Sequence, residues 1–190
     1  MKRWNTAVFG SGFMGRVHRE AIRRLGTVDV LAIADSRLEG AERLAEQFPA
    51  KRAVADYREV LSDPAVDAVH ICTPNALHFP MAKAALEAGK HVVCEKPLTT
   101  SSAEARILVD LAARSGLRNC LNHNLRYYPM VQQMRRLREA GELGEILVVQ
   151  GSYSQDWLLY DSDWNWRVDS AVGGPLRCMA DIGTHWFDMA

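Results

Sequence analysis

The sequence predicts an α/β protein built on a doubly wound parallel sheet, and three observations lead to that class. Short apolar stretches alternate with amphipathic helical stretches about six times in roughly the first 120 residues. A glycine-rich turn separates the first apolar stretch from the first helical one. Polar, turn-forming residues directly follow the apolar stretches. Strands joined by right-handed helical crossovers form a parallel sheet, and ligands bind beyond the carboxyl ends of its strands.

Composition limits the classes of partner. The 190 residues carry 23 basic and 23 acidic side chains, so the formal net charge of zero indicates neither a nucleic-acid nor a membrane partner. The N-terminus shows no signal-peptide pattern, and no apolar run is long enough to span a bilayer. The cysteines form no C-x-x-C pair, so we expect free thiols, no metal and a cytoplasmic location. They are Cys72, Cys94, Cys120 and Cys178.

The first strand, Thr6–Phe9, leads into a turn with the spacing G-x-G-x-x-G. Gly10 permits the tight turn, Gly12 leaves room for a pyrophosphate, and Gly15 lets the helix at 13–25 pack against the strand. Free N–H groups at the start of that helix then face the phosphates. An ordinary strand–helix turn is the alternative interpretation.

Asp35 strengthens the dinucleotide interpretation. It ends a second strand, Val28–Ala34, and lies 20 residues after Gly15, where a ribose-binding carboxylate is expected. Its charge favours the free 2′-hydroxyl of NAD and repels the 2′-phosphate of NADP. Arg37 could instead pair with that phosphate. The sequence therefore favours NAD and leaves NADP open.

The rest of the first unit, 1–122, is expected to be a Rossmann-type dinucleotide-binding domain. Its further elements are helix 37–48, strand 52–54, helix 57–61, strand 65–72, helix 77–88, strand 91–94, a helix that Ser101 or Ser102 caps and Gly116 follows, and strand 118–121. The strand ends carry Thr73-Pro74-Asn75, Glu95-Lys96-Pro97 and Asn122-His123-Asn124. These polar residues should converge on one edge of the sheet, as in an active site.

The second unit, 123–190, has a different pattern. We predict a basic amphipathic helix at 129–140, a strand at 146–153 and a helix from Asp181 to Met189, with a stretch rich in tryptophan and aspartate between the last two. A lone strand cannot bury a face. Either this unit wraps onto the first one, or the sheet to which its strand belongs is missing.

Three residues of these units could carry proton chemistry. Lys96 stands at a strand end between Glu95 and Pro97, where burial can shift the pKa of its amine and the proline stiffens the chain. Asp181 and His185 are four residues apart, so on a helix the acid could orient the imidazole. The alternatives are a surface lysine, an aspartate that only begins the helix and a histidine that only packs.

Four motifs together resemble the Gfo/Idh/MocA family of NAD(P)-dependent oxidoreductases, over nearly the whole chain. They are Gly10-Ser11-Gly12-Phe13-Met14-Gly15, Thr73-Pro74-Asn75-Ala76-Leu77-His78, Cys94-Glu95-Lys96-Pro97 and Asp181-Ile182-Gly183-Thr184-His185. The resemblance implies hydride transfer between NAD(P) and an alcohol or carbonyl carbon of a sugar, cyclitol or related polyol.

The resemblance also implies roles for residues. His185 would accept the proton, Asp181 would be its partner, and Lys96 would donate to the substrate oxygen. Arg126 and Trp166 are candidate substrate residues, although Arg126 could equally form an interdomain ion pair and Trp166 could belong to the core. The implied cofactor-binding residues are Gly10, Gly12, Phe13, Met14, Gly15, Asp35, Ser36, Arg37, Thr73, Pro74, Asn75, His78, Glu95, Lys96 and Asn124.

Two functions from different classes remain open at this point. One is a sugar or polyol dehydrogenase that forms homo-oligomers at full length. The other is a dinucleotide-binding module without catalysis. The family has a larger second α/β domain, so the resemblance implies that 123–190 is the N-terminal part of an incomplete substrate and oligomerisation domain. We therefore expect this 190-residue chain to bind its cofactor without efficient turnover.

Overall fold

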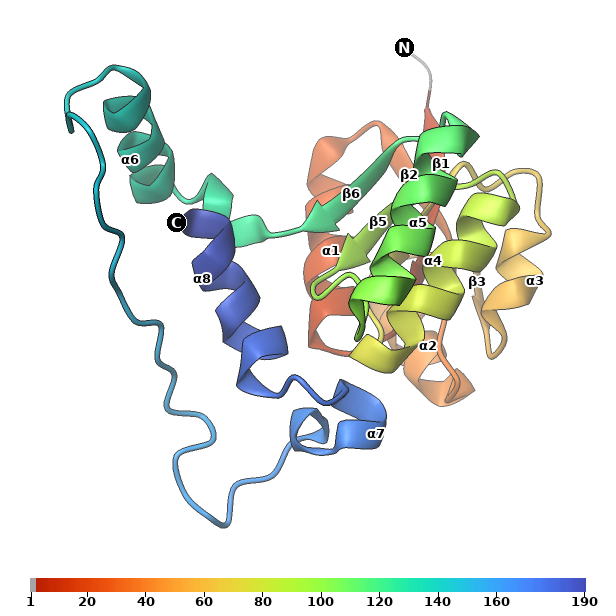
Figure 1. The fold of residues 1–190 in the computed structure, drawn as a ribbon. Helices are drawn as coiled ribbons and strands as arrows, with labels where there is room; N and C mark the ends of the chain where they lie inside the picture. Colours follow the sequence, from red (N-terminus) through yellow and green to blue (C-terminus); the bar gives the residue numbers. More distant parts are fainter. Residues whose placement is uncertain (1–2) are drawn as a thin grey trace.

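A computed structural model describes residues 3–190, and its centre is a six-stranded parallel sheet in the order β3-β2-β1-β4-β5-β6 (Figure 1). The strands are β1 (Trp4–Phe9), β2 (Val28–Ala34), β3 (Arg52–Val54), β4 (Ala68–Ile71), β5 (His91–Glu95) and β6 (Asn119–Asn122). The predicted doubly wound α/β class is confirmed. The order reverses between β1 and β4, and ligands bind at such a switch point in open parallel sheets.

Helices cover both faces of the sheet, so the central strands are buried on both sides. One apolar core lies under the first two helices and includes Val8, Ile33 and Leu44. The other includes Phe9, Ile71 and Leu108 under the later helices. The helices are α1 (Phe13–Leu25), α2 (Leu38–Gln47), α3 (Tyr57–Leu61), α4 (His78–Glu87) and α5 (Ser102–Ser115). None of the helices within 3–190 has the length and apolar character needed to cross a membrane.

Two glycines determine how α1 leaves the sheet. Gly10 has a φ of 96°, and a Cβ there would lie 2.6 Å from the carbonyl oxygen of Cys72. A Cβ at Gly15 would lie 2.1 Å from the carbonyl oxygen of Gly10, inside van der Waals contact. The helix can therefore approach the strand this closely only where neither residue has a side chain.

The sequence locates most elements of the first unit within a few residues. The helices at 13–25 and 57–61 and the strands at 28–34 and 52–54 match their predicted bounds. Ser101 caps α5 by accepting a hydrogen bond from the Glu104 amide, as one of the two predicted caps. The predicted helix 77–88 is preceded by a 3-10 turn, η1 (Asn75–Leu77), which turns the chain sharply after β4.

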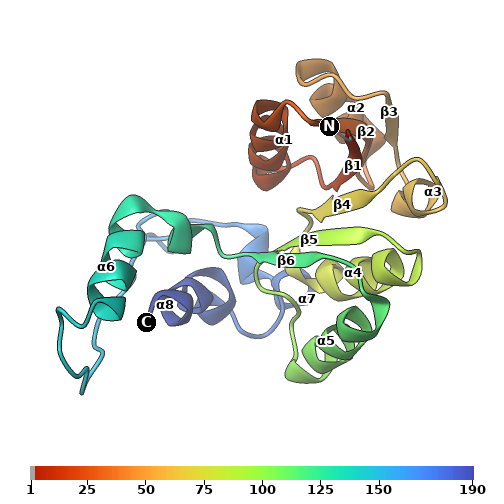
Figure 2. The same ribbon diagram turned by 90° about the horizontal axis from the view of Figure 1, so that it is seen from above.

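Residues 123–190 extend away from the sheet and return to it (Figure 2). After η2 (Asn124–Tyr127) and α6 (Pro129–Glu139), a long segment without regular structure leads back toward the end of β5. The remaining elements are η3 (Trp166–Val168), α7 (Ser170–Gly173), a π-helical turn η4 (Met179–Gly183) and α8 (Thr184–Met189). Helix α6 confirms the predicted helix at 129–140.

The predicted strand at 146–153 is wrong for this structure. These residues form no ladder with any strand in residues 3–190, and Leu147 and Val148 are 81% and 78% exposed. The apolar run has the composition of a strand, but a strand forms only where a neighbour takes up its backbone hydrogen bonds. The expected helix from Asp181 is also altered, because it begins in the π turn at Met179.

The close approach of α1 to β1 can be tested by Gly15→Ala. We expect a loss of stability of about 2–3 kcal/mol and a fall in Tm of roughly 4–12 °C, because the new methyl group collides with the Gly10 carbonyl. Thermal unfolding followed by circular dichroism measures this. Gly12→Ala is the matched control, since a Cβ there meets nothing within 4 Å. Equal Tm values for the two variants would contradict this account of the turn.

Candidate active site

A cavity of about 1010 Å³ follows the carboxyl edge of the sheet and continues under the returning segment. It begins at the glycine turn, passes the ends of β2, β4 and β5, and is closed on the far side by residues from 155 onward. The lining residues that the sequence analysis identified are Gly10, Gly12, Phe13, Met14, Asp35, Ser36, Arg37, Thr73, Pro74, Asn75, Glu95, Lys96, Asn124, Trp166, Asp181 and His185. The structure thus brings most of the predicted residues to one cavity.

Asp35 organises the glycine-turn end of the cavity. Its Oδ2 accepts hydrogen bonds from the Ser11 amide at 2.8 Å and the Ser11 hydroxyl at 2.6 Å, and its Oδ1 accepts one from the Arg37 amide at 3.0 Å. Burial alone would raise the pKa of this carboxyl, but the hydrogen bonds hold it below its ordinary value. Asp35 is therefore ionised at neutral pH, and its oxygens keep lone pairs for further donors.

A dinucleotide fits this end of the cavity. The absence of a side chain at Gly12 leaves open space where a Cβ would stand, so the backbone of the turn is accessible. Gly12 is also the N-cap of α1, whose first N–H groups have no intrahelical partners. Asp56, Tyr57 and Arg58 line the same end, and the sequence analysis did not select them.

His78 does not line the described cavity, contrary to its predicted role in cofactor binding. Its side chain is only 1% exposed and is not among the described residues that line the cavity. Its Nδ1 lies 2.6 Å from the carbonyl oxygen of Pro97 and its Nε2 lies 2.9 Å from that of Thr73. His78 therefore joins the chain after β4 to the chain after β5 and shapes the cavity from behind.

Asn75 ties the sheet edge to the returning segment. Its side-chain amide donates a hydrogen bond of 2.8 Å to the carbonyl oxygen of Gly173. Asn75, an implied cofactor-binding residue, thus also forms a structural hydrogen bond. Gly15, another predicted contact, packs against Gly10 and lies outside the lining.

Lys96 and Asp181 meet at the opposite end of the cavity from Asp35. The Lys96 Nζ donates to the backbone carbonyl of Asp181 at 2.5 Å and lies 3.3 Å from its Oδ1. The Nε of Arg167 lies 3.1 Å from the same Oδ1. The Lys96 and Asp181 side chains are only 13% and 19% exposed, so this is a largely buried cluster of two cations and one anion.

The amine of Lys96 is under two opposed influences. Burial lowers its pKa below the ordinary value of a lysine, while the charge and hydrogen bond of Asp181 raise it. Burial has the larger effect, and the Arg167 charge adds to it. Lys96 can therefore give up its proton more readily than a surface lysine.

His185 lies beside this cluster with an unused ring nitrogen. It is 8% exposed, and its Nδ1 has no hydrogen-bond partner among residues 3–190. Burial, followed by the positive charge of Lys96, lowers its pKa, so the imidazole is neutral near pH 7. Its ring packs edge-on against His123 with 5.6 Å between ring centres. A neutral, buried imidazole can accept a proton.

The predicted orientation of His185 by Asp181 is wrong for this structure. The Asp181 carboxylate is bonded to Lys96 and Arg167, and no hydrogen bond joins it to His185 in the described chain. The physical reason is charge, because two cations attract the carboxylate more strongly than a neutral imidazole does.

Arg126 also departs from its expected contact with substrate or cofactor. It forms an ion pair with Asp188 of α8, with its Nε 2.9 Å from Oδ2, and is absent from the described lining. Arg126 therefore forms a structural ion pair, which was the alternative interpretation of this residue. This pair holds η2 against the last helix.

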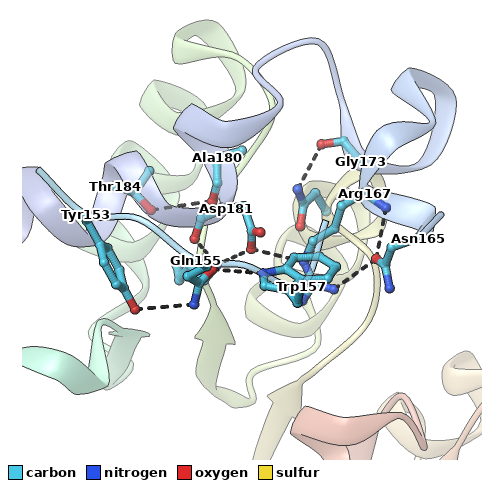
Figure 3. Close-up of polar contacts among 11 residues, drawn as sticks. Tyr153, Gln155, Trp157, Asn165, Arg167, Gly173, Ala180, Asp181 and Thr184 are labelled. Carbon is cyan, nitrogen blue, oxygen red and sulfur yellow. Dashed lines mark hydrogen bonds and ion pairs between the residues drawn. The ribbon is translucent and has the colours of Figure 1, made fainter. Parts of the chain in front are cut away.

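Arg167 is a site residue that the sequence analysis missed. Its guanidinium lies 4.4 Å from the ring centre of Trp166 and 5.5 Å from that of Trp157, and it faces Asp181 (Figure 3). Asn165 accepts a hydrogen bond from the Arg167 amide and so shapes η3, while Gln155 accepts one from the Trp157 indole. Tryptophans and Asx caps in an aperiodic stretch were the available signal for an ordered loop.

These features define a class of protein: a Rossmann-type dinucleotide-binding protein with a lysine, an aspartate and a histidine at the far end of its cavity. Residues 4–123 match the family model described as "Oxidoreductase family, NAD-binding Rossmann fold". Residues 131–190 match the model of the GFO/IDH/MocA C-terminal domain. The chain belongs to the Gfo/Idh/MocA oxidoreductase family, and the resemblance inferred from the motifs is confirmed.

Several relatives are dehydrogenases. The levoglucosan dehydrogenase of Pseudarthrobacter phenanthrenivorans is 34% identical over 100% of this chain and 51% of its own length. A structure of levoglucosan dehydrogenase in complex with NADH superposes with a TM-score of 0.95 at 33% identity, over 100% of this chain and 53% of that one. A scyllo-inositol 2-dehydrogenase (NADP(+)) of Bacillus subtilis is 30% identical over 95% of this chain and 49% of its own. The chain spans about half the length of these relatives.

The opposed influences on Lys96 can be tested with Asp181→Asn. We expect the pKa of Lys96 to fall further, because the variant removes the carboxylate that raises it and leaves the burial that lowers it. The pH dependence of Lys96 acylation, followed by peptide mass spectrometry, measures the shift. Asp56→Asn, at the other end of the cavity, should leave the Lys96 titration unchanged. An unchanged or higher pKa in Asp181→Asn would refute the ion-pair account.

Proposed function

We propose that the protein is an NAD(P)-dependent dehydrogenase or reductase that acts on an alcohol or carbonyl carbon of a sugar, cyclitol or related polyol. The observation that carries the proposal is the meeting of Lys96, Asp181 and His185 at one end of a cavity whose other end is the glycine turn. A module that only bound a dinucleotide would not need a buried lysine, an aspartate and a neutral histidine at the end of the cavity opposite the glycine turn.

The cofactor would extend along the carboxyl edge. The open backbone at Gly12 and the first N–H groups of α1 would hold the pyrophosphate, and Asp35 would bind the adenosine ribose. The nicotinamide would then lie near Pro74, Glu95 and Lys96, which line the far part of the same cavity. When bound, it supplies hydride transfer to or from the substrate carbon.

The chain itself would move the proton. During alcohol oxidation the imidazole of His185, which lines the cavity and is neutral, would accept the hydroxyl proton. Lys96 would hold the substrate oxygen by a hydrogen bond from Nζ, and it could share the proton because burial weakens its hold on it. Asp181 would position Lys96 through two contacts at its amine.

The substrate end suits a polyhydroxylated molecule. Trp157 and Trp166 provide indole surface, and Gln155, Asn165 and Arg167 provide hydrogen-bonding groups along the same wall. Indole faces stack on sugar rings, and polar side chains distinguish the hydroxyls. The solved levoglucosan dehydrogenase complex with NADH and levoglucosan, at a TM-score of 0.94, supports this class of substrate.

We further propose that the chain divides into a dinucleotide-binding unit at 1–122 and a second unit at 123–190. The exposed run that includes Leu147 and Val148 supports homo-oligomer formation by the full-length protein, through a sheet that this segment would join. The four free cysteines support a location in the reducing cytoplasm.

Cofactor choice is tested by comparing binding of NAD and NADP to the parent chain and to Asp35→Ala. We expect the parent to prefer NAD, and the variant to shift the ratio toward NADP by about ten-fold or more, because the variant removes a charge that repels the 2′-phosphate. Isothermal titration calorimetry measures both affinities. Asp63→Ala, outside the cavity lining, is the control. A strong NADP preference in the parent would contradict the choice of NAD.

Catalysis is tested in the full-length gene product with a panel of sugars and cyclitols. Lys96→Met and His185→Asn should each lower kcat by about 10²–10⁴-fold, since each removes a proton-transfer group, while the affinity of His185→Asn for NADH changes little. Absorbance of NADH follows the reaction. Binding with no turnover on any polyol in the parent would favour the non-catalytic module. Full activity in both variants would remove these residues from the mechanism.

A further inference from the structure

A buried hydrogen-bonded cluster lies behind the cavity, and three of its four residues have no part in the proposed mechanism. It consists of His18 on α1, His70 on β4, Glu95 at the end of β5 and Asn122 at the end of β6. The Nε2 of His18 lies 2.9 Å from the Glu95 Oε1, and the Nδ1 atoms of His18 and His70 lie 2.9 Å apart. The side-chain amide of Asn122 donates to the same Glu95 oxygen at 2.6 Å.

The chemistry of the contacts fixes which groups donate. A carboxylate only accepts, so His18 must carry a proton on Nε2. Of the two facing Nδ1 atoms, one must carry a hydrogen. In either arrangement His70 is neutral, since burial lowers its pKa to about 3. Both ring nitrogens of His18 are therefore within hydrogen-bond distance of a partner, and its Nε2–H points at Glu95.

The cluster keeps the Glu95 carboxylate ionised although the residue is buried. His18 and Glu95 are 7% and 6% exposed, and burial by itself would raise the pKa of the Glu95 carboxyl. The hydrogen bonds from His18 and Asn122 outweigh this and leave the pKa below its ordinary value. Glu95 also lines the cavity, whereas His18 is not among the described residues that do. A carboxylate fixed from behind therefore faces the ligand.

We propose that His18 is a positioning residue for the reactive end of the cofactor: it holds Glu95 as a fixed anion, so that the site favours the oxidised, positively charged nicotinamide over the reduced, neutral one. This inference rests on the proposed function, which places the nicotinamide near Glu95. The oxidised ring carries a positive charge and the reduced ring does not, so a nearby carboxylate stabilises only the former.

The neighbouring charges make the Glu95 anion necessary. Lys96 and Arg167 share the single carboxylate of Asp181, so that cluster carries one positive charge in excess, and Glu95 is the anion that opposes it. Loss of the Glu95 charge would leave this end of the cavity positive, which disfavours a positively charged ring. Replacement of His18 by an apolar residue would leave a buried carboxyl with one donor fewer. Such a carboxyl binds a proton more readily, and the negative charge is then lost.

The test measures the dissociation constants of NAD+ and NADH for the parent chain and for four variants, by calorimetry and by nicotinamide fluorescence. We expect His18→Leu and Glu95→Gln each to lower the preference for NAD+ over NADH by about ten-fold. His18→Gln should retain most of the preference, because its amide nitrogen is as many bonds from Cα as the Nε2 of histidine. If the parent prefers the phosphorylated cofactor, NADP+ and NADPH are used.

His91→Leu is the matched control, since it removes a partly buried imidazole from the opposite end of β5 and should leave the ratio unchanged. A loss of packing alone would weaken both redox states equally, and that result in folded His18→Leu would overturn the inference. If His18→Leu does not fold, Glu95→Gln and His18→Gln decide, and an unchanged ratio in Glu95→Gln overturns it. A parent chain that binds no dinucleotide would overturn the proposed function as well.

Discussion

The contact between Lys96 and Asp181 joins the two parts of the chain at the point where the chemistry is proposed to occur. Lys96 follows β5 of the sheet, whereas Asp181 lies in the last quarter of the sequence, on a segment that leaves the sheet and returns. Burying an ion pair is costly unless further bonds satisfy both partners. Here the backbone carbonyl of Asp181 takes a second bond from the amine, and Arg167 satisfies the carboxylate from the other side. The bond from Asn75 to Gly173 fixes the same segment a short way upstream.

This arrangement divides the roles of the three candidate catalytic residues. Because Asp181 is committed to two cations, it raises the pKa of Lys96 and leaves His185 without a hydrogen-bonded acid. Burial and the charge of Lys96 keep His185 neutral, and a neutral imidazole can accept a proton whereas a charged one cannot. The charges of Lys96 and Arg167 produce this division, since they attract the carboxylate more strongly than the neutral imidazole of His185 does.

The sequence predicts the first unit well because its signals are local. Gly10 and Gly15, the apolar strands and the helix caps depend on residues close in sequence, and the elements there fall within a few residues of their predicted bounds. The misses depend on distant partners. The 146–153 run has no neighbouring strand in the described chain, His78 is turned to two carbonyls, and Arg126 binds Asp188. Arg167 escaped notice because only folding brings the aperiodic tryptophan-rich stretch over Asp181.

Glu95 and Lys96 are adjacent in sequence, yet they belong to two separate polar networks. Successive side chains of an extended chain point to opposite sides, and Glu95 is the last residue of β5. The carboxylate therefore faces α1 and β6, where His18 and Asn122 bind it, while the amine faces the returning segment and Asp181. The two charges still attract each other, but each is held by its own set of partners. One is held as a fixed anion beside the cavity, and the other keeps a proton that burial makes easier to release. Because side chains alternate at the end of β5, two adjacent residues take different roles: Glu95 supplies a fixed negative charge, and Lys96 supplies an acid–base group.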